Sequence, residues 1–564
     1  MKTQNHTFLP QLSRPFISLL LLSLLLTACA MPTAGPTPTP TRTPKPTLTP
    51  TPVPTPTLVP TPTPAFPVTV SCGGIVPAAA CAHLQESVTQ DPQHFSWVQD
   101  PALADIQLGD NNLLNAVPVG TWTYVVAAPF FTVENEVSAG DLIATWTGAP
   151  TGPFIERPLL VTTDVLKGMS SWGPPTGEQL QVVAATELLP VAEQTGGWAI
   201  LPFDELTPAW KILQVDGVSV SEKGLDLETY PLTRSLYLGS SSRPETLALF
   251  NFSPDDFSNR HEEGMTIVAM TGVTAMTRAF AAWMERKGNT YAGEDIRELL
   301  VSADFTHISN EVSFRTGCQP QPSGTMSFCS SDDYIELLEF VGADIIELTG
   351  NHLADKGLEP LSHTLDMYRE RGWQWYGGGE DLADATRPLT VTQGPNRLAF
   401  IGCNPIGPAY DWATEDSPGS APCDYEKMQN QVRELRDAGY LPIVTLQYLE
   451  TEQYYPTAQQ VRDFRSFAEA GAVVMQGSQA HQVQTMEFYG DTFIHYGLGN
   501  LFFDQNWPEA RPDFIDRLVF YDGRLLSVDL RPTILGDYGR RRPMTPEEER
   551  PFLEMIFSLS PRGQ

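Results

Sequence analysis

An apolar run passes directly into a polar loop at Asp344-Ile345-Ile346-Glu347-Leu348-Thr349-Gly350-Asn351-His352-Leu353-Ala354-Asp355-Lys356-Gly357. The run predicts a buried strand that ends at Gly350, and a helical pattern resumes after the loop. Open α/β sheets bind ligands at such strand ends. The amide of Asn351, the imidazole of His352 and the carboxylate of Asp355 can together bind a metal or transfer protons. The alternative is a helix cap followed by a surface histidine, and the local pattern favours neither.

A second polar loop, residues 477–484, also follows an apolar run and leads to Tyr496-Gly497-Leu498-Gly499-Asn500-Leu501-Phe502-Phe503-Asp504-Gln505. Together with the Asn351-His352 loop, these segments resemble the bacterial CapA family, which is named for capsule and poly-γ-glutamate synthesis. That family is similar to the calcineurin-like metallophosphoesterases. The resemblance covers about residues 265–505 and implies a layered α/β sandwich of the metallophosphoesterase type. The alternation of strand and helix patterns in this region favours the same fold class.

The resemblance also implies a metal site at the strand ends, with a divalent ion such as Mn, Zn or Fe as cofactor. In calcineurin-like enzymes two metals bind phosphate oxygens and generate a hydroxide nucleophile at neutral pH. Carried over residue by residue, the catalytic candidates are His352, as general acid, and Asp355. The metal-ligand candidates are Asn310, Glu311, Asn351 and His481, with Glu450 as a substitute ligand.

Three positions depart from the family pattern. Val273 stands where the first strand of the family ends in an aspartate, and Gln447 and Gln479 stand where histidines are common. Valine cannot ligate, and a neutral amide is a weaker ligand than imidazole for zinc, iron or manganese. One interpretation is a metal-dependent hydrolase or transferase, similar to the phosphoesterases, that retains one metal. The other is a metal-free domain that binds a cell-surface polymer or serves as an interaction scaffold.

The N-terminus has the pattern of an export signal. Lys2 and Arg14 precede a short apolar run, Phe16 to Leu26, and Leu26-Thr27-Ala28-Cys29 follows. The run is too short to span a membrane comfortably, and the small residues before Cys29 resemble a bacterial lipoprotein signal. We therefore expect residues 1–29 to be a signal peptide region and Cys29 to carry the lipid that anchors an extracytoplasmic protein to a membrane. A plain secretory signal is the alternative.

The remaining cysteines predict disulfides. The chain has seven cysteines, and setting Cys29 aside leaves an even number in an exported protein. They fall as three pairs that are local in sequence, although sequence alone does not prove connectivity. The predicted pairs are Cys72–Cys81, Cys318–Cys329 and Cys403–Cys423.

Composition divides the chain into five parts. Residues 30–67 are rich in Thr and Pro and predict an extended linker. Residues 68–250 predict an α/β domain whose strand and turn order resembles a solute-binding domain of the phosphate-binding type, through Val125–Ala128, Leu142–Trp146, Val215–Gly217 and Tyr230–Leu232. Residues 262–535 form the CapA-like domain, and residues 536–564 are expected to be a C-terminal tail. That tail contains Arg540-Arg541-Arg542, a basic run typical of a solvated face.

The charge balance restricts the partners. The chain has 67 acidic and 35 basic residues and a net charge of −32, which excludes a nucleic-acid partner. The same charge repels a polyanion unless a local basic patch or a metal intervenes. The resemblance implies an exported lipoprotein that acts in the synthesis or processing of a capsular or cell-envelope polymer. The alternatives are a non-catalytic lipoprotein that binds such a polymer and a solute receptor that acts through residues 68–250.

Overall fold

The computed structural model describes residues 66–240, 243–253 and 255–561. The predicted signal peptide, the lipidation site Cys29 and nearly all of the Thr/Pro linker lie outside the described residues. Among the described residues, every helix is too short or too polar to cross a bilayer.

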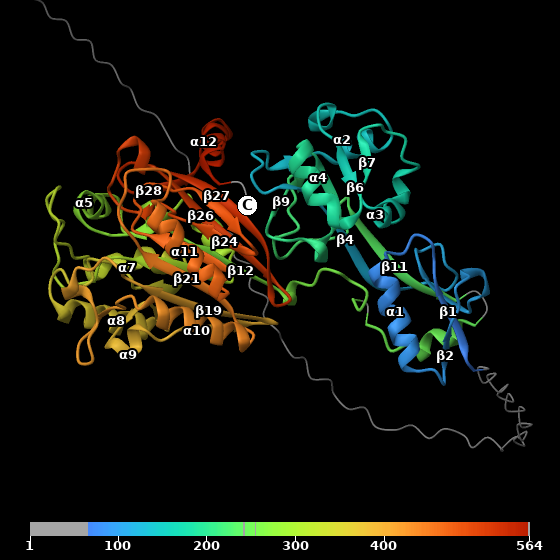
Figure 1. The fold of residues 1–564 in the computed structure, drawn as a ribbon, viewed down its shortest axis with the longest axis horizontal. Helices are drawn as coiled ribbons and strands as arrows, with labels where there is room; N and C mark the ends of the chain where they lie inside the picture. The colour runs from blue at the N-terminus through green and yellow to red at the C-terminus, as the bar shows by residue number, and fades with distance from the viewer. Residues whose placement is uncertain (1–65, 241–242, 254, 562–564) are drawn as a thin grey trace, which may run out of the picture. The chain divides into compact units, whose positions relative to one another are not determined.

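The first α/β region is built on a mixed sheet with the strand order β2-β1-β3-β11-β4-β8-β6-β7, and β9 pairs with β4 (Figure 1). Its long strand β4 carries the buried run Tyr124–Ala128 and pairs with both β11 and β8. The strands are β1 Val68–Cys72, β2 Phe95–Trp97, β3 Ile106–Gly109, β4 Val117–Pro129, β6 Leu159–Val161, β7 Leu180–Val182, β8 Trp198–Pro202, β9 Trp210–Ile212 and β11 Thr233–Ser240. The helices are α1 Ala78–Gln90, α2 Ala139–Trp146, α3 Thr163–Gly168 and α4 Leu188–Thr195. Two short strands, β5 Glu136–Val137 and β10 Gln214–Val215, pair with each other.

The second region is built on a nine-stranded sheet and a six-stranded sheet. The first has the order β16-β15-β14-β12-β26-β27-β28, with β13 between β14 and β25. Its strands are β12 Met265–Met270, β13 Val273–Thr274, β14 Phe305–Asn310, β15 Ala343–Glu347, β16 Gln374–Tyr376, β25 Asn500–Phe502, β26 Pro512–Tyr521, β27 Arg524–Gly536 and β28 Arg540–Pro543. The second sheet has the order β18-β19-β21-β22-β24-β23. Its strands are β18 Leu389–Gln393, β19 Asn396–Cys403, β21 Leu441–Gln447, β22 Val474–Ser478, β23 Met486–Tyr489 and β24 Thr492–His495.

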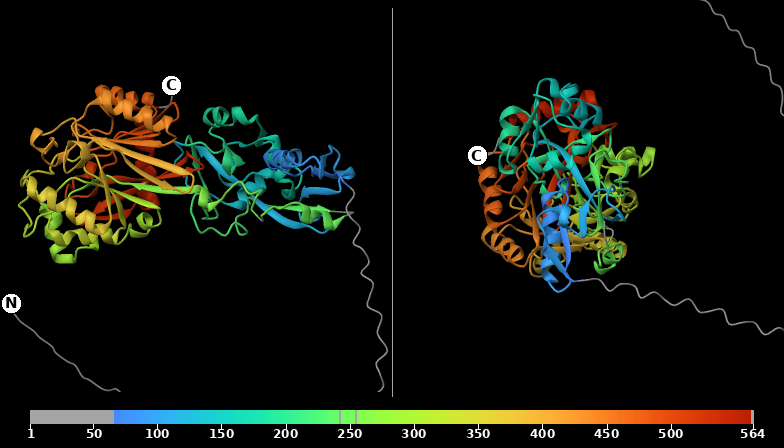
Figure 2. Two further views of the ribbon diagram at one scale, coloured as in Figure 1. Left: turned by 90° about the horizontal axis from the view of Figure 1, so that it is seen from below. Right: turned by 90° about the vertical axis from the view of Figure 1, so that its right-hand side faces the viewer.

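The two sheets pack face to face, with helices on both outer sides (Figure 2, left). One buried cluster joins Met270 and Ile345 of the first sheet to Phe400 and Ile443 of the second. On the outer side of the first sheet lie α5 Arg278–Lys287, α7 Ile335–Phe340 and α8 Leu358–Arg371, and on the outer side of the second lie α10 Tyr425–Asp437 and α11 Ala458–Ala470. Shorter helices are α6 Arg297–Val301 and α9 Leu382–Ala385. This is the layered α/β sandwich that the sequence predicts.

Two hairpins join consecutive strands, β23 with β24 and β26 with β27, and the second turns at Asp522-Gly523. The disulfide predictions are confirmed. All three predicted disulfides, Cys72–Cys81, Cys318–Cys329 and Cys403–Cys423, are present.

The prediction that residues 536–564 are a C-terminal tail is wrong, because this segment folds as part of the domain. Residues 540–543 form β28, which pairs with β27, and α12 Pro546–Leu559 packs Phe552 and Ile556 into the core between the sheets. Neighbouring side chains on a strand point to opposite faces, so Arg541 points to the face opposite Arg540 and Arg542. Arg541 is fully buried, although the run Arg540-Arg541-Arg542 was expected to be solvated.

Candidate active site

The loops that carry the candidate residues leave the carboxyl ends of parallel strands in both sheets. Glu311 follows β14 and Asn351 follows β15 in the first sheet, while Gln447 ends β21 and Gln479 follows β22 in the second. Gly350 allows the approach, because a Cβ atom there would lie 2.8 Å from the Cα of Glu311. The fold thus brings side chains from four separate segments to one edge of the sandwich.

The side-chain amide of Gln447 contacts the other three side chains. The Nε2 of Gln447 donates to Asn351 Oδ1 at 3.1 Å, to Glu311 Oε1 at 3.4 Å and, more closely, to Gln479 Oε1. Glu311 is only 2% exposed, and its Oε2 is buried without a hydrogen-bond partner. Burial raises the pKa of Glu311 above its usual range, while the nearby charge of His352 opposes that rise.

His352 and Asp355 form an oriented pair. The Nδ1 of His352 lies 2.7 Å from Asp355 Oδ2, which also accepts a hydrogen bond from the backbone N–H of Phe328 at 2.7 Å. Burial favours a lower pKa for His352, but the hydrogen bond to Asp355 and the charge of Glu311 outweigh it, and the pKa is raised. An imidazole fixed through Nδ1 presents Nε2 as the atom for proton transfer.

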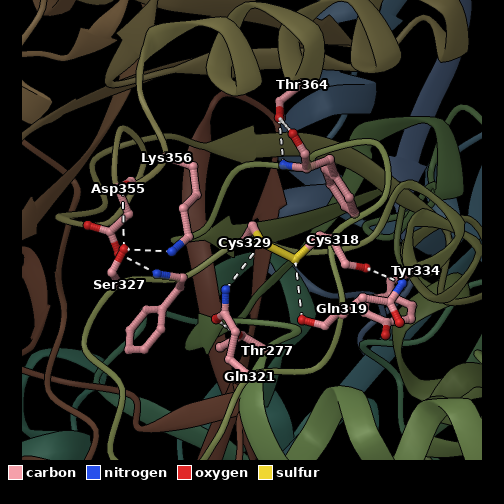
Figure 3. Close-up of a disulfide and its surroundings, with 12 residues drawn as sticks. Thr277, Cys318, Gln319, Gln321, Ser327, Cys329, Tyr334, Asp355, Lys356 and Thr364 are labelled. Atoms are coloured by element: carbon pink, nitrogen blue, oxygen red, sulfur yellow. Dashed lines mark hydrogen bonds between the residues drawn. A yellow bond between two sulfur atoms is a disulfide. The ribbon is translucent and has the colours of Figure 1, made fainter.

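The loop that carries Phe328 is closed by the Cys318–Cys329 disulfide (Figure 3). Figure 3 shows Asp355 and Lys356 beside this loop, where Lys356 Nζ donates to Ser327 Oγ at 2.8 Å. The disulfide and these bonds hold Phe328 against the His352 ring, with ring centroids 4.4 Å apart.

His481 enters the same site from the second sheet. Its Nδ1 lies 2.7 Å from Asn500 Oδ1, and its Nε2 lies 4.0 Å from Glu450 Oε1. Burial lowers the pKa of His481, and the charge of His352 lowers it further. The ring of His481 contacts Phe503, which in turn contacts Phe328. The two loops therefore meet, and the contact between Phe503 and Phe328 connects their imidazoles.

Asn310 lies apart from this group. Its amide donates to the hydroxyl of Tyr368 in α8 at 2.7 Å and to the carbonyl of Val312 at 3.0 Å, and the side chain is fully buried. The neighbouring Glu311 is the residue of this pair that reaches Gln447.

Sequence reasoning missed a cation at the site. Arg278, the first residue of α5, lies over the rings of both Phe328 and Phe503, 5.1 and 4.7 Å from their centroids. Its guanidinium pairs with Asp504, which also accepts from the backbone N–H of Ala279 at 3.0 Å. Arg278 adopts a left-handed backbone with φ of 49°, a conformation that no sequence pattern near it signals.

Asp411 was also missed. It accepts from the backbone N–H of Ala354 at 2.6 Å, and burial raises its pKa to about 7. It adds a second acidic group behind the His352 loop, on a segment far away in the sequence.

The donor set does not fit a pair of transition-metal ions. Val273 is buried in β13 and has no donor atom, and Gln447 and Gln479 offer neutral amides that already contact each other. Within residues 66–240, 243–253 and 255–561, no group of three or more His, Cys, Asp and Glu side chains is arranged to hold a metal ion. Zinc, iron and manganese centres need charged or imidazole ligands to offset their desolvation.

Comparison with known proteins supports the resemblance. Residues 267–505 match the family model described as "Bacterial capsule synthesis protein PGA_cap". The chain is 22% identical to the capsule biosynthesis protein CapA of Bacillus anthracis over 51% of this chain and 71% of that protein. It is 21% identical to the PGA biosynthesis protein CapA of Bacillus subtilis over 44% of this chain and 67% of that protein.

Two solved structures are similar at low TM-scores. An ABC-type phosphate transport receptor from Vibrio cholerae matches 32% of this chain and 90% of its own, with 13% identity and a TM-score of 0.28. The NAD nucleotidase of Haemophilus influenzae matches 53% of this chain and 57% of its own, with 10% identity and a TM-score of 0.30.

Proposed function

We propose that this chain, which belongs to the bacterial CapA family of capsule synthesis proteins through residues 267–505, acts in the synthesis or processing of a capsular or cell-envelope polymer. The observation that supports this is the convergence of the His352 and His481 loops, from two different sheets, on the contacting rings of Phe328 and Phe503. A fold alone would not require these polar loops to meet.

We further propose that the site is a degenerate form of the two-metal centre. Glu311, Asn351 and His481 keep their places, whereas Val273, Gln447 and Gln479 remove donors or weaken them. Catalysis, where it occurs, then depends on the chain's own groups. His352, oriented by Asp355 at 2.7 Å, would donate a proton to a leaving oxygen through Nε2.

Non-catalytic polymer binding is the second candidate. The observation that favours it is the closed hydrogen bonding among Gln447, Gln479 and Asn351, which occupies groups that a hydrolase would direct at substrate.

The test uses the purified full chain with poly-γ-glutamate and with an uncharged polysaccharide as the comparison polymer. Binding is measured by co-sedimentation and chain cleavage by gel filtration of the polymer. Binding that is specific for the polycarboxylate, with or without cleavage, supports the proposal. If the full chain neither retains nor shortens either polymer, the proposal is wrong.

His352→Gln separates the two candidates. It keeps a polar side chain but removes the proton donor, so an enzyme loses cleavage while a binding protein retains its affinity. Asn430→Asp, on the outer face of α10, is the matched surface control and should change neither activity.

Export and lipid anchoring through Cys29 are part of the same proposal. The sequence Leu26-Thr27-Ala28-Cys29 supports it. Cys29→Ala should move the expressed protein from the membrane fraction to the soluble extracytoplasmic fraction. A variant that stays in the membrane fraction would show that the anchor lies elsewhere.

A further inference from the structure

A cavity of about 210 Å³ lies where the first α/β region meets the C-terminal strands and helix of the second. Residues 63–564 form one compact unit, and within it β9 contacts β27. Side chains of β9, β27 and α12 line the cavity, and none of its lining residues belongs to the His352–His481 site. Its volume exceeds the roughly 150 Å³ that holds a benzene-sized ligand in an engineered protein core. The space therefore suits a small organic molecule.

Most of the cavity wall is apolar. Phe130, Ile212 and Leu530 line it from the strands or their ends, and Leu553 and Phe557 line it from α12. Such a wall favours a ligand with a hydrocarbon body, because removing apolar surface from water is then the main source of affinity.

Lys211, in β9, brings a positive charge to this wall. Its Nζ donates to the carbonyl of Thr132 at 2.8 Å and to that of Val133 at 3.2 Å. An ammonium group has three N–H bonds, so one donor is left over. Among the residues that the structure describes, no carboxylate lies within 4.0 Å of this nitrogen. Burial lowers the pKa of Lys211 to about 8, although the charges of Asp529 and Glu549 oppose that fall.

The other charged groups of the wall already have partners. Arg531 pairs with Asp529 at 2.6 Å, and Glu549 accepts a hydrogen bond from Asn135 at 2.6 Å. The carboxylates of Asp529 and Glu549 would repel a ligand that carries several negative charges. The unmatched charge of Lys211 therefore favours a ligand with a single anionic group.

We propose that this cavity binds a small monocarboxylate with an apolar body, of the short-chain fatty acid class, whose carboxylate accepts from Lys211 Nζ while its hydrocarbon part contacts Leu553 and Phe557. A charge-assisted hydrogen bond is stronger in a largely apolar cavity than in water, so the carboxylate should contribute much of the affinity. Because both α/β regions supply the wall, a bound ligand would also strengthen their packing on each other. This site is additional to the proposed polymer function and does not depend on it.

The experiment compares three probes on the purified full chain. Hexanoate, its neutral isostere hexanamide and inorganic phosphate are each titrated by calorimetry at pH 7. We expect one hexanoate to bind, at least tenfold more tightly than hexanamide, and phosphate not to bind measurably. Saturating hexanoate should also raise the melting temperature.

Three results would overturn the inference. Equal affinities for hexanoate and hexanamide would mean that the cavity is apolar and that the charge of Lys211 has no role. Tighter binding of phosphate than of hexanoate would mean a plain anion site. The absence of hexanoate binding would mean that the cavity takes no such ligand.

Two variants locate the ligand. Lys211→Met keeps the unbranched stem and removes the ammonium group, so it should weaken hexanoate binding at least tenfold and leave hexanamide binding unchanged. Gln214→Glu adds a negative charge to the same wall with little change in shape, and it should also weaken hexanoate binding. It serves if Lys211→Met fails to fold. Hexanoate binding that persists unchanged in these variants contradicts the assignment.

Lys167→Met is the matched control. Lys167 is exposed in α3 of the same region and does not line the cavity, so this variant removes the same charge elsewhere. It should leave hexanoate binding unchanged, and an equal loss in both lysine variants would mean that hexanoate responds to overall charge. Polymer binding is measured separately, so the cavity can fail its test while the proposed polymer function stands, and the reverse.

Discussion

Replacement of Arg541 by methionine tests whether the C-terminal segment belongs to the domain. Arg541 is fully buried in β28 and donates to the carbonyls of Leu501 at 3.1 Å, Arg511 at 2.6 Å and Asn500. The carbonyl of Asn500 belongs to the residue whose side chain holds His481 at 2.7 Å. The substitution therefore removes support from the core and from the site at once.

The magnitude follows from what methionine leaves behind. Three buried carbonyls lose a charged donor, and Asp513 loses the nearest opposing charge. Breaking a buried charge interaction of this kind costs about 3–5 kcal/mol. For a domain of this size the melting temperature should fall by roughly 5–8 °C, measured by differential scanning calorimetry of the full chain.

The neighbouring Arg540→Met is the control. Arg540 is 36% exposed and forms surface ion pairs with Asp295 and Glu294, so its loss should cost less than about 1 kcal/mol. If Arg541→Met melted within about 3 °C of the Arg540→Met variant, residues 540–543 would not be part of the packed sheet, and the reasoning would be refuted.

Two further predictions concern buried groups. Burial raises the pKa of Asp513 from its ordinary value of 3.8 to about 7, although the charge of Arg541 opposes the rise. Because the folded state then binds this proton more tightly than the unfolded state, the contribution of Asp513 to stability is complete below pH 4 and is lost as the pH rises through 7. Asp513→Asn should remove this loss. The free energy of unfolding, measured in urea, should then decrease less between pH 5 and pH 8 in the variant than in the wild type. An identical pH profile in the two proteins would contradict the raised pKa of Asp513. Gly350→Ala should disrupt the site, because its Cβ would meet the Glu311 backbone at 2.8 Å, and calorimetry should show a lower melting temperature. Ala→Gly at exposed Ala438, after α10, is the surface comparison, and equal effects of the two substitutions would show that the approach at Gly350 is not tight.

The sequence was most informative where local pattern and fold agree. The helical pattern expected after the Asn351-His352 loop is the helix Leu358–Arg371. Asp522-Gly523 is a residue pair that favours a hairpin turn, and the chain turns there. Parallel pairing brings the carboxyl ends of β14 and β15 to one edge of the first sheet, and those of β21 and β22 to one edge of the second. The meeting of the His352 and His481 loops across the two sheets was expected only from the family resemblance.

What sequence could not show depends on long-range packing. Three consecutive arginines look alike in sequence, but pairing with β27 buries only the middle one. Arg278 lies over the rings of Phe328 and Phe503 because its guanidinium pairs with Asp504, which is more than two hundred residues away in sequence. Likewise, the contact of Gln447 with three oxygens from distant loops is set by the packing of one sheet on the other, and no spacing encodes it.

Zinc titration of a repaired site tests the central claim most directly. The triple variant Val273→Asp, Gln447→His and Gln479→His restores the three donors that the family pattern has at these positions. Because Gln447 contacts both Gln479 and Asn351, the restored donors would lie together, and calorimetry should show that the triple variant binds about two zinc ions tightly while the wild type does not. A folded triple variant that binds zinc no better than the wild type, or a wild type that already binds two zinc ions tightly, would contradict the account.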